Sequence, residues 1–320
     1  MPKTQLSTTE LGRTGLEITR VGFGAWAIGG GGWEFGWGPQ EDEDSVAAIQ
    51  RSLELGVNWI DTAAAYGFGR SEEVVGRALE GMDDRPYVFT KCSLLEGRGR
   101  RVEHSLKRDS VLREAEASLN RLKLDAIDLH QIHWPNPAAD IEEGFSALAE
   151  LKERGLVRHI GVSNFDLDQI RRIQQIAPVE TLQPQYSLIV RDGESALLPF
   201  AEREGIGVIV YSPMSSGLLS GKMTRERIEN MPEDDWRKDD ERFQEPRLSE
   251  NLALVDRLET IADRHDTTPG AVAVAWTLRN PAVDGAIVGF RRPDQVDPML
   301  AAADLALTDT EVDEIEGKTT

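Results

Sequence analysis

Along the chain, short apolar runs alternate with longer stretches whose apolar residues recur every three or four positions. The pattern predicts buried strands followed by amphipathic helices, beginning with a strand from Val21 and a helix over 42–55 that ends at Gly56. Further strands are predicted at 57–61, 87–91, 126–132, 159–163, 181–186, 207–211 and 285–289. Further helices are predicted at 71–79, 107–122, 141–154, 167–176, 250–265, 269–279, 293–304 and 309–316.

Eight such alternations without a reversal signal favour one closed parallel (β/α)8 TIM barrel, an α/β fold, over residues 1–320. The alternative is an open doubly wound sheet, which normally has a phosphate-binding glycine turn directly after its first strand. Here an aromatic loop, 29–40, intervenes instead of a helix. A β-hairpin is predicted at 9–20, a charged loop at 96–106, and a long polar insertion that runs from Ser212 to about Leu248.

Polar side chains end three successive predicted strands. Asp61 ends one strand, Tyr66 lies in the turn that follows it, and Lys91 and His133 end the next two. In parallel barrels the carboxyl ends of strands carry the chemistry, so we expect these side chains to meet at one mouth. Taken singly, each has a structural explanation: a helix cap, a packed ring, a solvated strand end or a core histidine. The nearby His130 is interpreted as structural.

Charge and composition narrow the function classes. The net charge of −20 argues against nucleic acid and anionic membranes as partners. The sequence has no signal peptide and no apolar run of membrane-spanning length, so we expect a cytoplasmic protein. A single cysteine, Cys92, excludes an internal disulfide. His104, His159 and His265 lack metal-ligand spacing, so no metal is expected.

Four motifs, in this order, resemble those of the aldo-keto reductases. They are Asp61-Thr-Ala-x-x-Tyr66-Gly, the strand-end Lys91, Ile132-His-Trp-Pro and Gly161-Val-Ser-Asn-Phe. The segment from Gly289 to Pro293 is similar to the Gly-x-Arg-x-Pro cofactor segment of a bacterial branch. The resemblance implies a barrel plugged by its N-terminal hairpin, and an NADPH-dependent enzyme that reduces the carbonyl of a small aldehyde or ketone to an alcohol.

The four strand-end residues suit that chemistry. Hydride transfer to a carbonyl puts negative charge on oxygen, so the site needs a proton donor and a stabilising group. Tyr66 can donate the proton, and the ammonium of Lys91 can stabilise the phenolate that remains. Asp61 can pair with Lys91, and His133 can orient the substrate oxygen. The resemblance assigns the same catalytic roles to these positions.

By resemblance, the later strands hold NADPH or NADP+. Ser163, Asn164 and Gln183 would hold the carboxamide, Tyr211 would stack on the nicotinamide, and Arg291 is our choice for the 2′-phosphate. The other expected cofactor contacts are Ala25, Trp26, Ser212, Pro213, Met214, Ser216, Gly217, Leu218, Lys222, Gly289, Phe290 and Gln295. Trp33, Trp37 and Trp134 are expected to bind the substrate.

The insertion 222–248 is expected to cover the cofactor, because its charges and sparse apolar residues are not expected to form a core of their own. An alternative function is a slow or non-catalytic NADP(H)-binding subunit that senses redox state. A metal-dependent hydrolase on the same barrel would need a His/Asp ligand cluster, which the sequence lacks. The sequence specifies neither the substrate nor the oligomeric state.

Overall fold

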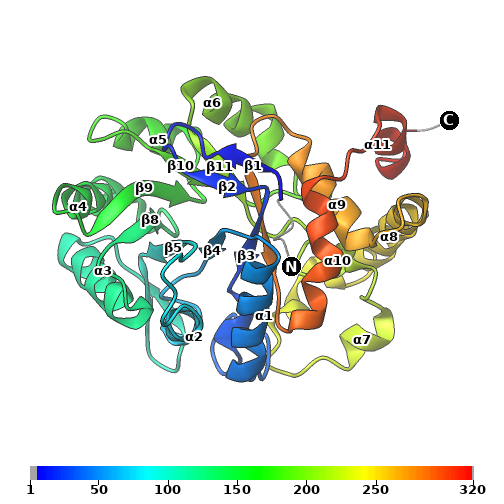
Figure 1. Ribbon diagram of the computed structural model, residues 1–320, viewed down its shortest axis with the longest axis horizontal. Coiled ribbons are helices and arrows are strands. Elements are labelled where there is room, and N and C mark those ends of the chain that lie inside the picture. Colours follow the sequence, from blue (N-terminus) through cyan, green and yellow to red (C-terminus); the bar gives the residue numbers. More distant parts are fainter. Residues whose placement is uncertain (1–5, 319–320) are drawn as a thin grey trace.

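The computed structural model describes residues 6–318 and shows a closed barrel wrapped by helices (Figure 1). Within these residues the eight parallel barrel strands, in order around the ring, are β3 (Val21–Gly24), β4 (Trp59–Asp61), β5 (Tyr87–Cys92), β8 (Ile127–Ile132), β9 (Val157–Ser163), β10 (Thr181–Gln183), β11 (Gly207–Val210) and β12 (Gly285–Gly289). Pairing of β12 with β3 closes the ring. The predicted (β/α)8 barrel is confirmed, and the open sheet is excluded.

Helices cover the outside of the barrel (Figure 1). They are α1 (Asp42–Glu54), α2 (Arg70–Ala78), α3 (Arg108–Leu122), α4 (Ile141–Glu153), α5 (Leu167–Ile173), α6 (Leu197–Glu204), α7 (Arg225–Glu229), α8 (Arg247–Arg264), α9 (Pro269–Leu278), α10 (Asp297–Leu300) and α11 (Asp309–Ile315). Local signals set several starts: Asp166 and Gln169 form a capping box at α5, and Thr268 caps α9 ahead of Pro269. None of the described helices is long and apolar enough to cross a membrane.

Two apolar layers follow from the alternation of side chains along each strand. Inward-facing residues such as Trp59, Phe89 and Leu129 fill the barrel, while their neighbours pack outward against the helices. Gly22 makes room for the largest of these side chains, because a Cβ at that position would lie 2.1 Å from the ring of Trp59. Because the interior is filled, a ligand can bind only at an end of the barrel, and the candidate site lies at the carboxyl end of the strands.

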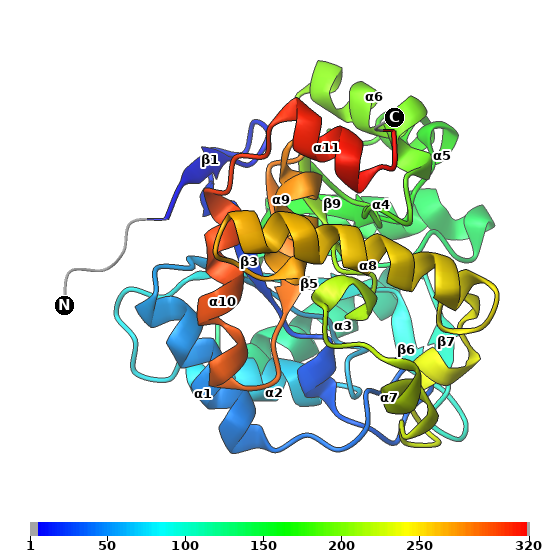
Figure 2. The same ribbon diagram turned by 90° about the vertical axis from the view of Figure 1, so that its right-hand side faces the viewer.

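The N-terminal hairpin, β1 (Thr8–Glu10) and β2 (Glu17–Thr19), lies at the opposite end of the barrel. Its apolar residues Leu11 and Ile18 belong to the same buried cluster as Trp59 inside the barrel. Asp284 fixes the hairpin turn, because its carboxylate accepts the N–H of Gly12 at 3.1 Å and that of Val208 at 2.9 Å. Figure 2 shows β1 and the insertion that contains α7 at opposite ends of the molecule.

Three segments differ from the sequence prediction. The loop at 96–106 overlaps an antiparallel pair, β6 (Leu94–Glu96) and β7 (Val102–His104). The helix expected at 293–304 is divided into a 3-10 turn, the short α10 and a second 3-10 turn. The insertion buries an apolar cluster, Leu218, Met223, Met231, Phe243 and Leu248. The expectation that it forms no core was therefore wrong: widely spaced apolar residues meet once the chain folds back on itself.

Candidate active site

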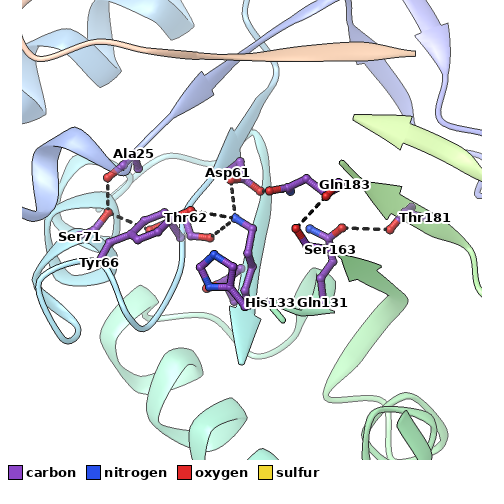
Figure 3. Close-up of polar contacts among 12 residues, drawn as sticks. Ala25, Asp61, Thr62, Tyr66, Ser71, Gln131, His133, Ser163, Thr181 and Gln183 are labelled. Atoms are coloured by element: carbon purple, nitrogen blue, oxygen red, sulfur yellow. Dashed lines mark hydrogen bonds and ion pairs between the residues drawn. The ribbon is translucent and has the colours of Figure 1, made fainter. Parts of the chain in front are cut away.

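An ion pair between Asp61 and Lys91 lies at the centre of the site. Asp61 ends β4, and Lys91 lies near the end of the adjacent β5. Lys91 Nζ donates to Asp61 Oδ1 at 2.5 Å and to the carbonyl of Thr62 at 2.9 Å, and Gln183 Nε2 donates to Asp61 Oδ2 at 2.8 Å (Figure 3). Burial raises the pKa of Asp61 and lowers the pKa of Lys91, and the contact between them opposes both shifts.

Tyr66 lies in the turn after β4, with its hydroxyl 3.4 Å from Lys91 Nζ. Burial, the charge of Asp61 and the proximity of Tyr211 raise the pKa of the Tyr66 phenol well above its usual value. Asp61 adds to this rise from its position beside Lys91, and Tyr66 keeps its proton at neutral pH.

His130 lies within β8 and His133 directly follows it, and the two side chains have different environments. His133 is half-buried, and its ring meets the edge of the Tyr66 ring with centroids 5.6 Å apart. Burial and then the charge of Lys91 lower the pKa of His133 well below its usual value, so the ring is neutral at pH 7. His130 is fully buried, and neither ring nitrogen has a hydrogen-bond partner among the described residues. It points away from the barrel interior, where its neighbour Leu129 lies.

A cavity of about 300 Å³ opens beside these groups, and Asp61 and Tyr66 form part of its wall. Most of the expected cofactor contacts line it: Ala25, Trp26, Tyr211, Ser212, Pro213, Met214, Ser216, Gly217, Lys222, Gly289, Phe290, Arg291 and Gln295. Ser163, Asn164, Gln183 and Leu218 are not among the lining residues. Of the expected substrate residues, Trp37 lines the cavity and Trp134 is exposed, whereas Trp33 is buried against Ala63 and Tyr66.

Hydrogen bonds connect Tyr211 in the cavity wall to the backbone of His133. Tyr211 Oη donates to Asn164 Oδ1 at 2.8 Å, and Asn164 Nδ2 donates to the carbonyl of His133 at 2.9 Å. Ser163 Oγ donates to the carbonyl of Gln183 at 2.7 Å (Figure 3). The side-chain amides of Asn164 and Gln183 are therefore already bonded to protein groups.

The turn after β11 has an unusual backbone. Ser212, Ser215, Ser216 and Gly217 have φ angles of 54°, 47°, 57° and 88°, in the left-handed region. Three of these residues are serines, for which this conformation is unfavourable. Such strain is typical of turns that approach a ligand, and turns of this kind direct backbone N–H groups toward anions.

Cationic side chains gather at one end of the cavity. Its lining includes Lys222, Arg227, Arg237, Arg291 and Arg292. Burial, then Arg237, and more weakly Arg292 and Arg227, lower the pKa of Arg291 against the opposing effect of Asp235. Arg291 Nε donates to Gln40 Oε1 at 2.7 Å. Arg237 and Arg292 are paired with Asp235 and Asp294, so the positive charge that favours an anionic ligand here comes mainly from Lys222, Arg227 and Arg291.

The insertion contributes residues that we did not identify from the sequence. The ring of Trp236 stacks on Trp26 with centroids 5.3 Å apart, and Trp26 stacks on Tyr66 at 6.2 Å. The guanidinium of Arg237 lies 4.4 Å above the ring of Trp37 and is paired with Asp235. The sequence did offer one signal, because Trp236 is an aromatic residue flanked by charges in a polar insertion. That signal does not identify which ring Trp236 contacts.

Comparisons with known proteins identify the family of this chain. The profile of the Aldo/keto reductase family matches residues 20–319. The chain is 39% identical to aldo-keto reductase YhdN of Bacillus subtilis over 266 residues, which is 82% of this chain and 80% of that protein. It is 33% identical to an NADH-specific methylglyoxal reductase of Escherichia coli over 289 residues, or 86% of this chain and 87% of that enzyme.

Solved structures show the same barrel. The glycerol dehydrogenase AKR11B4 of Gluconobacter oxydans matches with a TM-score of 0.87 at 36% identity, over 99% of this chain and 95% of that one. An aldo/keto reductase from Klebsiella pneumoniae, solved with NADP and acetate, matches with a TM-score of 0.75 at 25% identity, over 98% of this chain and 95% of that one. The chain therefore belongs to the aldo/keto reductase family, oxidoreductases that act on small carbonyl substrates with nicotinamide cofactors.

Proposed function

We propose that this protein reduces aldehydes or ketones to alcohols with NADPH, and that Tyr66 is the proton donor. The observation that carries the proposal is the Tyr66 hydroxyl, 3.4 Å from Lys91 Nζ in the wall of the cavity. When bound, the nicotinamide supplies the hydride. The protein must then protonate the developing alkoxide, and the raised pKa of Tyr66 keeps its proton in place until the substrate oxygen becomes basic.

The neighbours of Tyr66 have distinct roles in this proposal. Lys91 lies close enough to stabilise the phenolate once the proton has left, and Asp61 keeps Lys91 charged despite its burial. His133, neutral at pH 7, can donate one ring N–H to the substrate oxygen and so orient the carbonyl. The bond from Asn164 to the His133 carbonyl fixes the backbone that carries this ring.

The cavity suits a phosphorylated dinucleotide. Tyr211 offers a flat face for the nicotinamide ring, and the strained turn 212–217 is suited to a pyrophosphate. Of the residues proposed for the carboxamide, Asn164 is bonded to the Tyr211 hydroxyl, Gln183 to Asp61 and Ser163 to the Gln183 carbonyl, so some of these bonds would be exchanged on binding. The insertion 222–248 is proposed to cover the bound cofactor, as its contact with Trp26 supports. Slower hydrogen exchange in 222–248 on adding NADPH would test this.

Preference for NADPH over NADH rests on the cationic end of the cavity. Arg291 and Arg292 lie in the turn after β12, where Gln295 Oε1 accepts the N–H of Arg291 at 2.7 Å and that of Arg292 at 3.2 Å. Gln295 thus shapes the turn, and Arg291 is the proposed ligand of the 2′-phosphate. A 2′-phosphate is an anion that a guanidinium binds well.

The substrate side of the mouth is aromatic. Trp37 lines the cavity, and Trp134 and Phe35 are 42% and 40% exposed, whereas Trp33 supports the Tyr66 ring from the core. These surfaces suit small carbonyl compounds with a flat or apolar part. Two relatives are named for glycerol and for methylglyoxal, which supports small substrates that carry a second oxygen next to the reacting carbon.

The test is a steady-state assay of NADPH oxidation against aldehydes, ketones, sugars and quinones, with Tyr66→Phe as the variant. We expect Tyr66→Phe to lower kcat by about 10²–10⁴-fold while NADPH affinity is retained, because the phenol donates a proton and the ring stays in place. Near-normal turnover by Tyr66→Phe would refute the assignment. Tight NADPH binding with negligible turnover of every carbonyl by the wild type would favour the redox-sensing alternative.

A further inference from the structure

Two carboxylates lie behind β5, the strand that carries Lys91. Glu72 of α2 accepts a hydrogen bond from Thr90 Oγ1 at 2.5 Å and pairs with Arg121 Nη2 at 2.6 Å. Glu114 of α3 is 7% exposed and forms no ion pair with any residue between 6 and 318. A buried carboxylate without a cation partner is unfavourable, so its remaining contacts must account for its place in the fold.

Glu114 holds a strained residue. Its Oε2 accepts the backbone N–H of Ser93 at 2.9 Å, and its Oε1 accepts Ser110 Oγ at 3.2 Å. Ser93 is fully buried and has a φ of 85°, a left-handed conformation that is unfavourable for serine. Such a backbone persists only where surrounding contacts fix it. Here those contacts include Glu114 and the N–H of Ser105, which donates to the Ser93 carbonyl at 3.1 Å.

Ser93 in turn joins the ends of two barrel strands. It follows Lys91 by two residues, and its Oγ accepts the N–H of Trp134 at 3.3 Å and contacts the Trp134 carbonyl at 3.4 Å. The N–H of His133 donates to the carbonyl of Cys92 at 3.0 Å. The backbones that carry Lys91 and His133 are thus tied together at Ser93.

We propose that Glu114 is a positioning residue: by accepting the N–H of Ser93 from outside the barrel, it fixes the positions of Lys91 and His133 relative to each other. The inference rests on the roles proposed for these two residues. Glu114 contacts neither the cavity nor the reacting groups, and acts through the backbone. Catalytic side chains must be held in place by supporting residues of this kind, because a small displacement removes much of their effect on the reaction rate.

The same contact makes the position of these groups sensitive to pH. Burial, and more weakly Glu72, raise the pKa of Glu114 to about 7, against the opposing effects of the bonds from Ser93 and Ser110 and of the charge of Arg121. Facing it from β5 is Cys92, whose pKa is raised well above its usual value and which therefore stays a thiol. The carboxylate is a stronger acceptor than the protonated acid. The Ser93 contact therefore strengthens as the pH rises through about 7.

The experiment compares Glu114→Gln and Glu114→Leu with Glu116→Leu, a matched change at an exposed position of α3. We expect Glu114→Leu to lower kcat by about 10–100-fold, with NADPH affinity unchanged, because the reacting groups shift while the cofactor contacts remain. Glu114→Gln keeps an acceptor for Ser93, so its kcat should stay within about threefold of wild type. We also expect wild-type kcat to rise from pH 6 to pH 8 and expect no such rise in Glu114→Gln, whose amide does not titrate.

Hydrogen exchange gives a readout that does not need turnover. Segments 93–105 and 133–136 should exchange faster in Glu114→Leu than in Glu116→Leu. Wild-type kcat and protection in Glu114→Leu would overturn the inference. An equal loss of kcat in Asp128→Asn would also overturn it. That variant removes the charge of another buried carboxylate, which is bonded to Arg85 and to the N–H of Val88. An inactive wild type would refute the proposed function and leave the exchange result to decide the role of Glu114.

Discussion

Removing the ammonium of Lys91 should cost stability as well as activity. In Lys91→Met, Asp61 keeps the bond from Gln183 at 2.8 Å and loses the ammonium at 2.5 Å, which leaves a buried carboxylate with no cation partner. Breaking a buried ion pair in this way costs about 3–5 kcal/mol of unfolding free energy. Replacing both partners removes the unpaired charge, so Asp61→Asn/Lys91→Met should lie within about 1–2 kcal/mol of wild type.

The sign of the pH dependence follows from the direction of the Asp61 shift. Without Lys91, burial holds the folded-state pKa of Asp61 further above its unfolded value. A raised pKa adds stability below the unfolded value that is lost as the pH rises through the folded value. The deficit of Lys91→Met relative to wild type should therefore grow as the pH rises above the unfolded value of about 4, and the double variant should show no such growth.

Urea unfolding followed by circular dichroism measures these free energies, with Lys107→Met as the control because Lys107 is exposed. Carbonyl reduction measured on the same samples separates stability from chemistry. Both Lys91 variants should lose about 10²–10⁴-fold in kcat, since neither can stabilise the phenolate of Tyr66. A double variant as unstable as Lys91→Met, or one that regains activity, would show that the reasoning about this pair is wrong.

Three further predictions concern other parts of the molecule. His130→Phe should keep near-wild-type kcat, because the ring points away from the cavity and has no hydrogen-bond partner among the described residues; loss of turnover would mean that the wrong histidine was chosen. Arg291→Ala should weaken NADPH binding by about 1.5–3 kcal/mol and leave NADH binding nearly unchanged, whereas Gln40→Ala, which removes one of the two contacts of the Arg291 guanidinium and leaves that with the Pro39 carbonyl, should keep the preference for NADPH in titrations. Burial raises the pKa of Asp284 to about 6, so its contribution to stability is present at acidic pH and is lost as the pH rises from about 4 to about 6; melting temperatures of Asp284→Asn, which cannot titrate, should be flatter over that range.

The sequence alone determined the barrel and the positions of Asp61, Tyr66, Lys91 and His133. Strand and helix periodicities are local properties, and the right-handed strand–helix–strand connection leaves few arrangements for eight such units. A residue at the carboxyl end of a parallel strand must lie at the barrel's mouth. The positions of the four proposed catalytic residues therefore followed from their places in the chain.

The tertiary structure decided which side chains face one another. The contact of Arg291 with Gln40, the stacking of Trp236 on Trp26 and the contact of Glu114 with Ser93 join segments with no common local pattern. In irregular loops no fixed period separates inward from outward residues, which is why Trp33 was expected at the substrate and lies in the core. The direction of the shift in the pKa of Tyr66 was also set by the tertiary structure, because the pKa of a buried group depends on all the charges around it, and these come from separate strands.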